Sequence, residues 1–263
     1  MILAIDIGNT NIVMGCIDQD KIYFVARLAT NHTKTDVQYA IELKSILELH
    51  EFDRSRIDGT IISSVVPPLT NIMKQATSII TGKDPMIVLP GLKTGLNIKI
   101  DNPAQLGSDL VVGAVAAMAQ YPKPIVIVDL GTATKFSVID SKGIFLGGVI
   151  MPGINVSLDA LTSHTAQLPK ISLESPKLVI GTNTIDSMNS GIVYGTASMI
   201  DGIIERIEDE ISMPVTVIAT GGLAKFIVSH CKREIIYDPD LMLKGLYLIY
   251  TKNAKKETIP LQM

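Results

Sequence analysis

Several classes of protein are disfavoured by what this 263-residue sequence lacks. Its two cysteines, Cys16 and Cys231, are too few for a disulfide framework or a four-thiolate zinc site. Its formal net charge is −3, so no basic excess suggests DNA or RNA as a partner. No uncharged apolar run reaches membrane-spanning length, and Asp6 interrupts the first apolar run too early for a signal peptide. We therefore expect a cytosolic protein that binds neither nucleic acid nor membranes.

The two commonest nucleotide-binding motifs are also missing. The stretch TGKD at 81–84 lacks the upstream glycine of a P-loop and the hydroxyl after its lysine. No G-x-G-x-x-G follows a predicted strand, which disfavours a Rossmann site. The four histidines show no metal-ligand spacing and are taken as structural or surface residues.

The sequence does contain enough apolar residues for a sizeable core. Apolar residues make up 47% of the chain and charged residues 19%, which argues against disorder. The pattern begins with strands over 2–6, 12–17 and 22–28, and Thr35 and Gln38 form a capping box before a helix over 36–50. Further elements are predicted as a strand over 60–66 ended by Pro67 and Pro68, a helix over 69–79, a strand over 86–89 and a buried helix over 108–121.

The opening of the chain is repeated in its second half. DIGNT at 6–10 follows an apolar run, and VDLGTAT at 128–134 follows another, each ahead of a hairpin. The strand TVIATGG at 216–222 parallels TIISSVV at 60–66. One such match is weak, because D-x-G turns are common, but two at similar spacing favour duplication over chance. We predict an α/β protein of two related halves, 1–117 and 118–263, with an insertion around 151–195.

The repeated turns have the composition of an anion site. Glycine lets the backbone approach a ligand closely, and successive N–H groups form an anion-binding nest. Asn9, Thr10 and Thr132 add side-chain donors, and an aspartate at each strand end can hold a hard cation. Two such hairpins facing one another would bind a polyphosphate.

Paired phosphate hairpins followed by a late ATGG resemble the actin-like ATPase and sugar kinase superfamily, which implies two duplicated actin-like (ribonuclease H-like) lobes with mixed sheets and flanking helices. Within it, the ordered motifs resemble type III pantothenate kinases over nearly the whole chain. The motifs are DIGNTN at 6–11, DNPAQLGSD at 101–109, DLGTAT at 129–134, GGVIMPGINVSLDAL at 147–161, TAQLP at 165–169, IGTNT at 180–184, SG at 190–191, ATGGLA at 219–224 and YDPDLMLKGLYLIY at 237–250.

The resemblance implies ATP-dependent phosphorylation of pantothenate to 4′-phosphopantothenate, the first step of coenzyme A biosynthesis. It also implies Mg²⁺, a monovalent cation (K⁺ or NH₄⁺) and a homodimer whose interface lies in the second half. Two alternatives stay open at this point. One is a non-catalytic regulatory relative that binds the ligand, and the other is a nucleotide or polyphosphate hydrolase on the same fold.

The same resemblance assigns residues. Asp109 is the catalytic base, although an acidic residue in a first helical turn also stabilises the helix dipole. Asp129 binds the monovalent cation and Asp6 binds Mg²⁺, directly or through water. The ATP-binding residues are Asp6, Ile7, Gly8, Asn9, Thr10, Asn11, Ile12, Val13, Gly131, Thr132, Gly221 and Gly222. The pantothenate-binding residues are Gly107, Ser108, Asp109, Leu110 and Thr184, of which Thr184 could equally be a loop hydroxyl or a helix N-cap.

Two positions depart from the family pattern. Leu110 stands where family members commonly carry an arginine that pairs with the pantothenate carboxylate, so that carboxylate needs another partner. Lys135 stands where they commonly carry threonine. We expect Lys135 to face solvent, as most strand lysines do; the alternative is that its ammonium group replaces the monovalent cation at Asp129.

Overall fold

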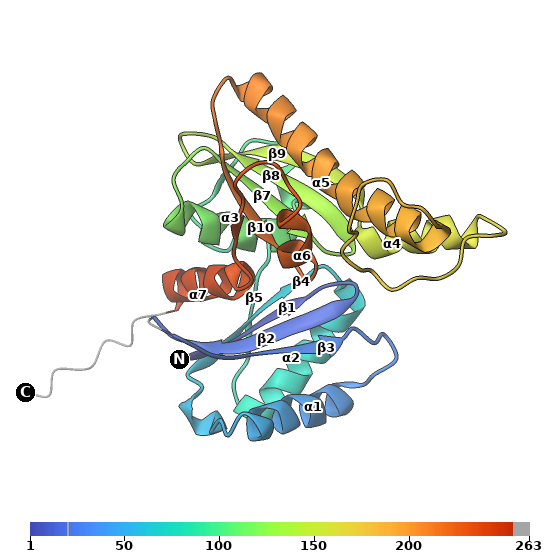
Figure 1. The fold of residues 1–263 in the computed structure, drawn as a ribbon. Helices are drawn as coiled ribbons and strands as arrows, with labels where there is room; N and C mark the ends of the chain where they lie inside the picture. Colours follow the sequence, from blue (N-terminus) through green and yellow to red (C-terminus); the bar gives the residue numbers. More distant parts are fainter. Residues whose placement is uncertain (20, 255–263) are drawn as a thin grey trace, which may run out of the picture. The chain divides into compact units, whose positions relative to one another are not determined.

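The computed structural model describes residues 1–19 and 21–254, which form two compact units (Figure 1). Unit 1 comprises residues 1–95, 104–116 and 242–254, and unit 2 comprises residues 96–103 and 117–241. These units divide the chain differently from the predicted halves, because the C-terminal segment packs within unit 1. The predicted boundary of the duplication at 117/118 stays a prediction.

Unit 1 is built on a five-stranded mixed sheet in the order β3-β2-β1-β4-β5. β1 pairs with β2 antiparallel and with β4 parallel. The predicted hairpins are confirmed, with ends that shift by a residue or two. The strands are β1 (Ile2–Ile7), β2 (Asn11–Ile17), β3 (Ile22–Ala29), β4 (Gly59–Ser64) and β5 (Met86–Ile87).

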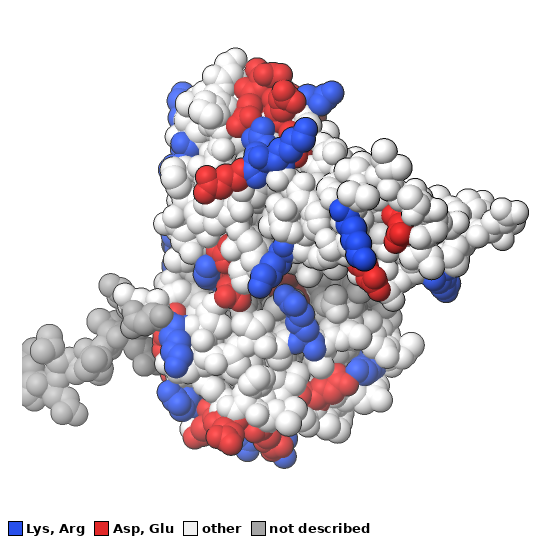
Figure 2. Space-filling view, in the orientation of Figure 1, with Lys and Arg blue, Asp and Glu red and all other residues white. Residues whose placement is uncertain are grey.

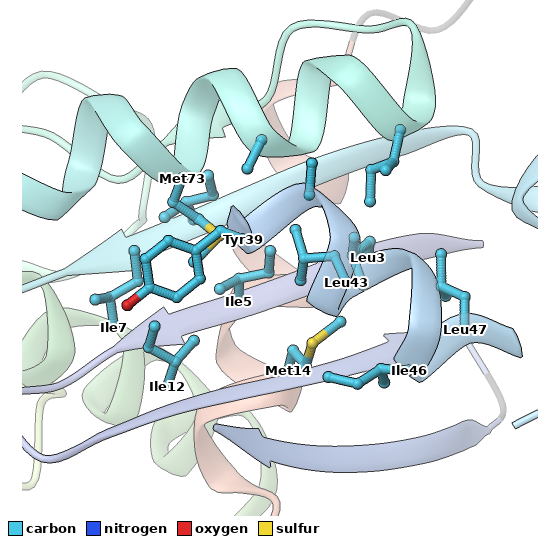
Figure 3. Packing of buried hydrophobic residues seen from close by; sticks show 14 of the residues in the cluster. Leu3, Ile5, Ile7, Ile12, Met14, Tyr39, Leu43, Ile46, Leu47 and Met73 are labelled. Carbon is cyan, nitrogen blue, oxygen red and sulfur yellow. The ribbon is translucent and has the colours of Figure 1, made fainter. Parts of the chain in front are cut away.

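Two helices cover one face of this sheet and bury its core (Figure 3). α1 (Asp36–Leu49) has the predicted capping box at Thr35 and Gln38. α2 (Pro67–Thr81) begins at the two prolines, which were expected only to end the preceding strand. Proline is tolerated in the first helical turn because the N–H groups there have no intrahelical partner. In Figure 3, side chains from β1, β2 and both helices interdigitate, including Leu3, Ile5, Met14, Tyr39, Leu43 and Met73.

α7 (Leu241–Asn253) packs on the other face of the same sheet. A Cβ on Gly15 would lie 2.9 Å from Leu243, and the Tyr250 hydroxyl abuts Gly59, so both glycines are needed for close approach. Met14 and Cys16, on either side of Gly15, belong instead to the core cluster under α1 and α2, in which Figure 3 labels Met14. The apolar helix predicted over 108–121 is confirmed as α3 (Ser108–Gln120), which runs from unit 1 into unit 2.

Unit 2 repeats the topology of unit 1. Its sheet has the order β11-β10-β7-β8-β9-β6, and β7 pairs with β8 antiparallel and with β10 parallel. Apart from β6, which adds to the edge beside β9, each strand matches one of unit 1, so the predicted duplication of α/β lobes is confirmed. The strands are β6 (Asn97–Ile98), β7 (Ile125–Leu130), β8 (Ala133–Ile139), β9 (Ile144–Pro152), β10 (Thr216–Thr220) and β11 (Ile236–Tyr237).

The expected insertion of unit 2 contains two helical parts separated by residues 164–183, which form no helix or strand. α4 (Ile154–Ser163) follows β9, and α5 (Thr184–Ile211) packs its apolar stripe against β7 and β8 together with α6 (Ala224–Val228). Two short 3₁₀ helices, η1 (Arg54–Arg56) and η2 (Pro103–Gln105), complete the elements of the described residues. No helix among residues 1–19 and 21–254 is long and apolar enough to cross a membrane.

Charged side chains of both signs are interspersed on the face drawn in Figure 2. No broad patch of one sign covers the described residues on that face, as expected from the small net charge. The described part of this face therefore offers no charged patch as a candidate binding surface.

Candidate functional site

The first candidate element is the turn between β1 and β2, residues 8–10, which we call the first glycine turn. The Gly8 N–H donates to the Asn11 carbonyl over 3.0 Å, and a Cβ at Gly8 would lie 3.0 Å from that oxygen. Thr30, just beyond β3, braces the turn twice. Its N–H donates to the Thr10 carbonyl (2.9 Å) and its hydroxyl to the Gly8 carbonyl (2.7 Å). The turn is thus held in one shape, with the side chains of Asn9, Thr10 and Asn11 exposed.

The other predicted ATP-binding residues of this segment differ in what they can offer. Ile7 and Ile12 are fully buried in the unit 1 core, so only their backbone could contact a ligand. Asp6 lies one residue before the end of β1 and is half-buried, opposite Val13 in the β1–β2 register. Thr30 was missed by the sequence analysis, because nothing in the sequence marks a residue 22 positions away as a brace.

The second element is the start of α3, which carries Asp109. The Ser108 hydroxyl accepts from the Ser64 N–H (3.1 Å) and donates to the Ser64 carbonyl (3.0 Å), which ties the helix to the end of β4. Asp109 Oδ1 accepts from the Leu110 N–H at 2.8 Å. A Cβ at Gly107 would lie 2.5 Å from the same oxygen, so the carboxylate occupies space that only glycine leaves open. All four predicted residues, 107–110, are half-buried, and Ser108 acts here in positioning the helix.

The third element is the turn between β7 and β8, residues 131–132, which we call the second glycine turn. The Gly131 N–H donates to the Ala133 carbonyl (3.3 Å), and the Thr132 carbonyl accepts from the Gly153 N–H (3.0 Å). The Asp129 carboxylate lies against this turn, 3.5 Å from where a Cβ of Gly131 would be. Gly131 and Thr132 are exposed. Unit 2 therefore presents the same combination of aspartate, glycine and hydroxyl as unit 1.

Lys135 does not face solvent, so that expectation is wrong. Lys135 lies directly opposite Asp129 in the antiparallel register of β7 and β8. Side chains of directly opposed residues project from the same face of a sheet, within reach of one another. Lys135 Nζ is 2.9 Å from Asp129 Oδ2, and the two side chains are 19% and 27% exposed. The ion pair could have been anticipated by counting the register outward from the turn.

Gly221 and Gly222 follow β10 in the same unit. Gly221 has φ +102°, and a Cβ there would lie 2.6 Å from the Leu130 carbonyl, so the loop passes close to the end of β7. Nothing lies within 4 Å of the Cβ position of Gly222. The loop after β10 therefore leaves an open backbone surface near the second glycine turn.

Thr184 lies in an open groove of about 670 Å³ in unit 2. The groove is lined by polar groups of 182–184 and Ser187 and by apolar side chains from α4 and α5, including Leu161 and Met188. Thr184 is not the N-cap of α5. Asn183 is, since its side chain accepts from the Asp186 N–H at 2.9 Å. The Thr184 hydroxyl is thus left on the exposed first turn beside the groove.

Metal-binding side chains are sparse in the part of the chain that the structure describes. No group of three or more His, Cys, Asp or Glu residues within 1–19 and 21–254 is arranged to hold a metal. A divalent cation would therefore need oxygen ligands from a bound substrate as well as a protein carboxylate.

A solved structure shares the architecture. The activator of the 2-hydroxyisocaproyl-CoA dehydratase of Clostridium difficile, solved with bound ADPNP, matches with a TM-score of 0.54 at 13% identity and covers 97% of this chain and 98% of that chain. At this identity the likeness concerns the fold alone. It agrees with the duplicated α/β lobes described above and confirms the expected actin-like fold class.

Sequence relatives are much closer. A type III pantothenate kinase of Halalkalibacterium halodurans is 46% identical over 254 residues, covering 97% of this chain and 100% of the relative. Another, from an Exiguobacterium species, is 44% identical over 255 residues, with coverage of 97% and 100%. The family model described as Type III pantothenate kinase matches residues 2–206. The motif order, the duplicated fold and these matches agree, and the chain belongs to the type III pantothenate kinase family.

Proposed function

We propose that this chain transfers a phosphoryl group from ATP to the primary hydroxyl of pantothenate, giving 4′-phosphopantothenate for coenzyme A biosynthesis. The observation that carries the proposal is the match of residues 2–206 to the family, with Asp109 retained at the start of α3. Relatives that share 42–46% identity over nearly the whole chain are named as such kinases. No observation on the described residues favours the regulatory or the hydrolytic alternative.

The proposed chemistry needs positioning and charge neutralisation more than covalent catalysis. The glycine turns offer backbone N–H groups and the hydroxyls of Thr10 and Thr132 to phosphate oxygens. Mg²⁺, held by Asp6 together with phosphate oxygens and water, would supply positive charge to the triphosphate. The resemblance also implies a monovalent cation beside Asp129. The ion pair with Lys135 argues against this cation, because Lys135 already places a positive charge there.

Asp109 is the proposed base. The contacts at 107–110 fix its carboxylate at the half-buried start of α3, where it can accept the proton of the pantothenate hydroxyl as the phosphoryl group transfers. Thr184 and the groove beside it are the proposed contact for the rest of pantothenate. Leu110 cannot pair with the pantothenate carboxylate, so we propose that a different cationic group or backbone N–H takes that role.

The test of this function is ADP release with and without pantothenate, with the product identified by mass spectrometry. We expect Asp109→Asn to lower kcat by about 10²–10⁴-fold, the usual contribution of a general base. Asp36→Asn is the matched control, because Asp36 is also an acidic residue in a first helical turn, that of α1. ADP release that ignores pantothenate would indicate a hydrolase, and an unaffected Asp109→Asn variant would remove Asp109 from the mechanism.

We also propose a homodimer formed through unit 2. Apolar side chains are unusually exposed in the segment before α5, where Leu178, Val179 and Ile180 are 70%, 65% and 81% exposed. On α5 nothing lies within 4 Å of the Cβ positions of Gly191 and Gly195, so a second chain could approach the helix closely. Exposed apolar patches of this kind commonly mark protein interfaces.

The dimer is tested by the mass in solution at micromolar concentration. Ile180→Asp is expected to yield monomers, whereas Leu89→Asp, at a 60% exposed apolar position of unit 1, leaves the mass unchanged. A wild-type chain that is fully active as a monomer would contradict the proposal. The absence of nucleic-acid and membrane partners and the cytoplasmic location stay predictions from the sequence.

A further inference from the structure

Lys135 places a cationic side chain beside the second glycine turn, where it pairs with Asp129. Asp129 and Lys135 are opposed in register, and Nζ lies 2.9 Å from Oδ2. This length is that of a charge-assisted hydrogen bond. Lysine side chains are mostly exposed, yet this one is only 19% exposed, on a strand whose next four residues, 136–139, are all buried. The ammonium group is therefore held at the turn rather than left in bulk solvent.

The duplication provides an internal comparison. Asp6 and Asp129 occupy equivalent places, one residue before the ends of β1 and β7, and each lies ahead of a glycine turn. The residue opposite Asp6 is Val13, which carries no charge. The residue opposite Asp129 is Lys135. The two copies thus differ in the residue directly opposite the aspartate, which is uncharged in unit 1 and cationic in unit 2.

A monovalent metal ion does not fit beside Asp129 as this chain is built. An ion that takes the Asp129 carboxylate as a ligand, as the family resemblance implies, would share Oδ2 with an ammonium group that carries the same charge as K⁺ or NH₄⁺. An added cation within contact distance of that oxygen would lie close to Lys135 Nζ and be repelled by it. The residues present therefore disagree with the cation that the family resemblance implies.

We infer that the ε-ammonium group of Lys135 is the resident cation of the second glycine turn and takes the place of a dissociable monovalent ion. It neutralises Asp129 beside the turn, so that the anionic carboxylate does not oppose a phosphate bound there. The inference rests on the proposed function for the role of the turn, but the ion pair itself is independent of the substrate. It predicts a kinase of this family whose activity does not depend on potassium or ammonium.

The first arm of the test measures turnover in Tris, sodium, potassium and ammonium chlorides at constant ionic strength. The wild-type rate should be equal in all four within about twofold. Lys135→Thr and Lys135→Met should lose about tenfold or more in Tris, as when one preorganised electrostatic group is removed from an active site. Potassium or ammonium should restore Lys135→Thr, which leaves room for the ion. Lys142→Met, which removes an exposed lysine from the next turn of the same unit, should behave as wild type.

The second arm detects the ion without any turnover. In the absence of substrates, potassium should raise the Tm of Lys135→Thr by about 2–4 °C relative to Tris and leave the wild-type Tm unchanged. A thallium peak at Asp129 in crystals of the variant, and none in the wild type, would give the same answer directly. If neither the wild type nor any variant phosphorylates pantothenate in any buffer, the proposed function is wrong. The Tm and thallium measurements would still test the inference about Lys135, because they need no turnover.

Three results would overturn the inference. They are a wild-type rate that rises severalfold with potassium or ammonium, thallium bound at Asp129 in the wild type, and a Lys135→Thr variant that is fully active in Tris. A Lys135→Thr variant that stays folded but is rescued by neither ion would also count against it, because the lysine would then do something that a free cation cannot.

Discussion

The hydroxyl of Thr30 is expected to matter for ATP binding, although Thr30 itself lies outside the first glycine turn. Thr30→Val keeps the shape of the side chain and the N–H bond to the Thr10 carbonyl, but it removes the 2.7 Å bond to the Gly8 carbonyl. One neutral hydrogen bond contributes about 1 kcal/mol, which corresponds to about a fivefold change in an equilibrium constant. Gly8 is half-buried, so water can reach the vacated carbonyl, and the full penalty of about 3 kcal/mol for an unpaired group is not expected.

The expected result is a free energy of unfolding lowered by about 1 kcal/mol and an ATP Kd raised about two- to fivefold. Chemical denaturation and calorimetric titration with ATP measure the two quantities separately. Thr251→Val is the matched control, since it removes a single 3.0 Å hydroxyl bond to the Leu248 carbonyl in α7 of the same unit. It should lose similar stability with no change in Kd. If both variants bind ATP as the wild type does, the shape of the first glycine turn is not what binds the nucleotide.

Three further outcomes are expected. Gly107→Ala should lower kcat by about 10²-fold at unchanged ATP affinity in stopped-flow and titration assays, because its Cβ displaces the Asp109 carboxylate. Tyr39→Phe should lower the free energy of unfolding in urea by about 1–3 kcal/mol, since the buried hydroxyl donates to a backbone carbonyl at 2.9 Å and accepts from an N–H at 3.0 Å. Burial raises the pKa of Cys16 and Cys231 from 9.0 to about 12, so iodoacetamide should label both thiols in urea and neither in the native protein. Between about pH 9 and pH 12 both thiols lose their protons in the unfolded chain but keep them in the folded chain. The free energy of unfolding, measured by urea titration, should therefore fall as the pH rises through this range.

The strand–turn–strand framework was predictable because it depends on local pattern. Apolar runs ending in D-x-G turns identified both hairpins and their order along the chain, and the capping box at Thr35 was found from side-chain chemistry alone. The local sequence pattern did not predict the shortest strands. β6 and β11 have two residues each, too few for any alternation to be recognised. The helices of the insertion were also hidden by its Gly, Ser and Thr residues, several of which lie in the first turns of α5.

The candidate site was predictable to the extent that its residues follow the turns. Distant braces such as Thr30 and the assignment of α7 to unit 1 depend on contacts between residues far apart in the sequence, and no local signal records them. The prediction that Lys135 faces solvent failed for a different reason. A general preference of lysine for solvent was given more weight than the register, which a short turn fixes.

The packing of α7 within unit 1 has a consequence for how the protein is made. Residues 1–95 of unit 1 are translated well before the helix that covers Gly15 and Gly59, which lies at 241–253. At usual elongation rates, about 150 further residues take on the order of ten seconds to be added after residue 95. During that interval one face of the unit 1 sheet lacks α7, so nascent chains should present an apolar surface to chaperones until α7 has been translated.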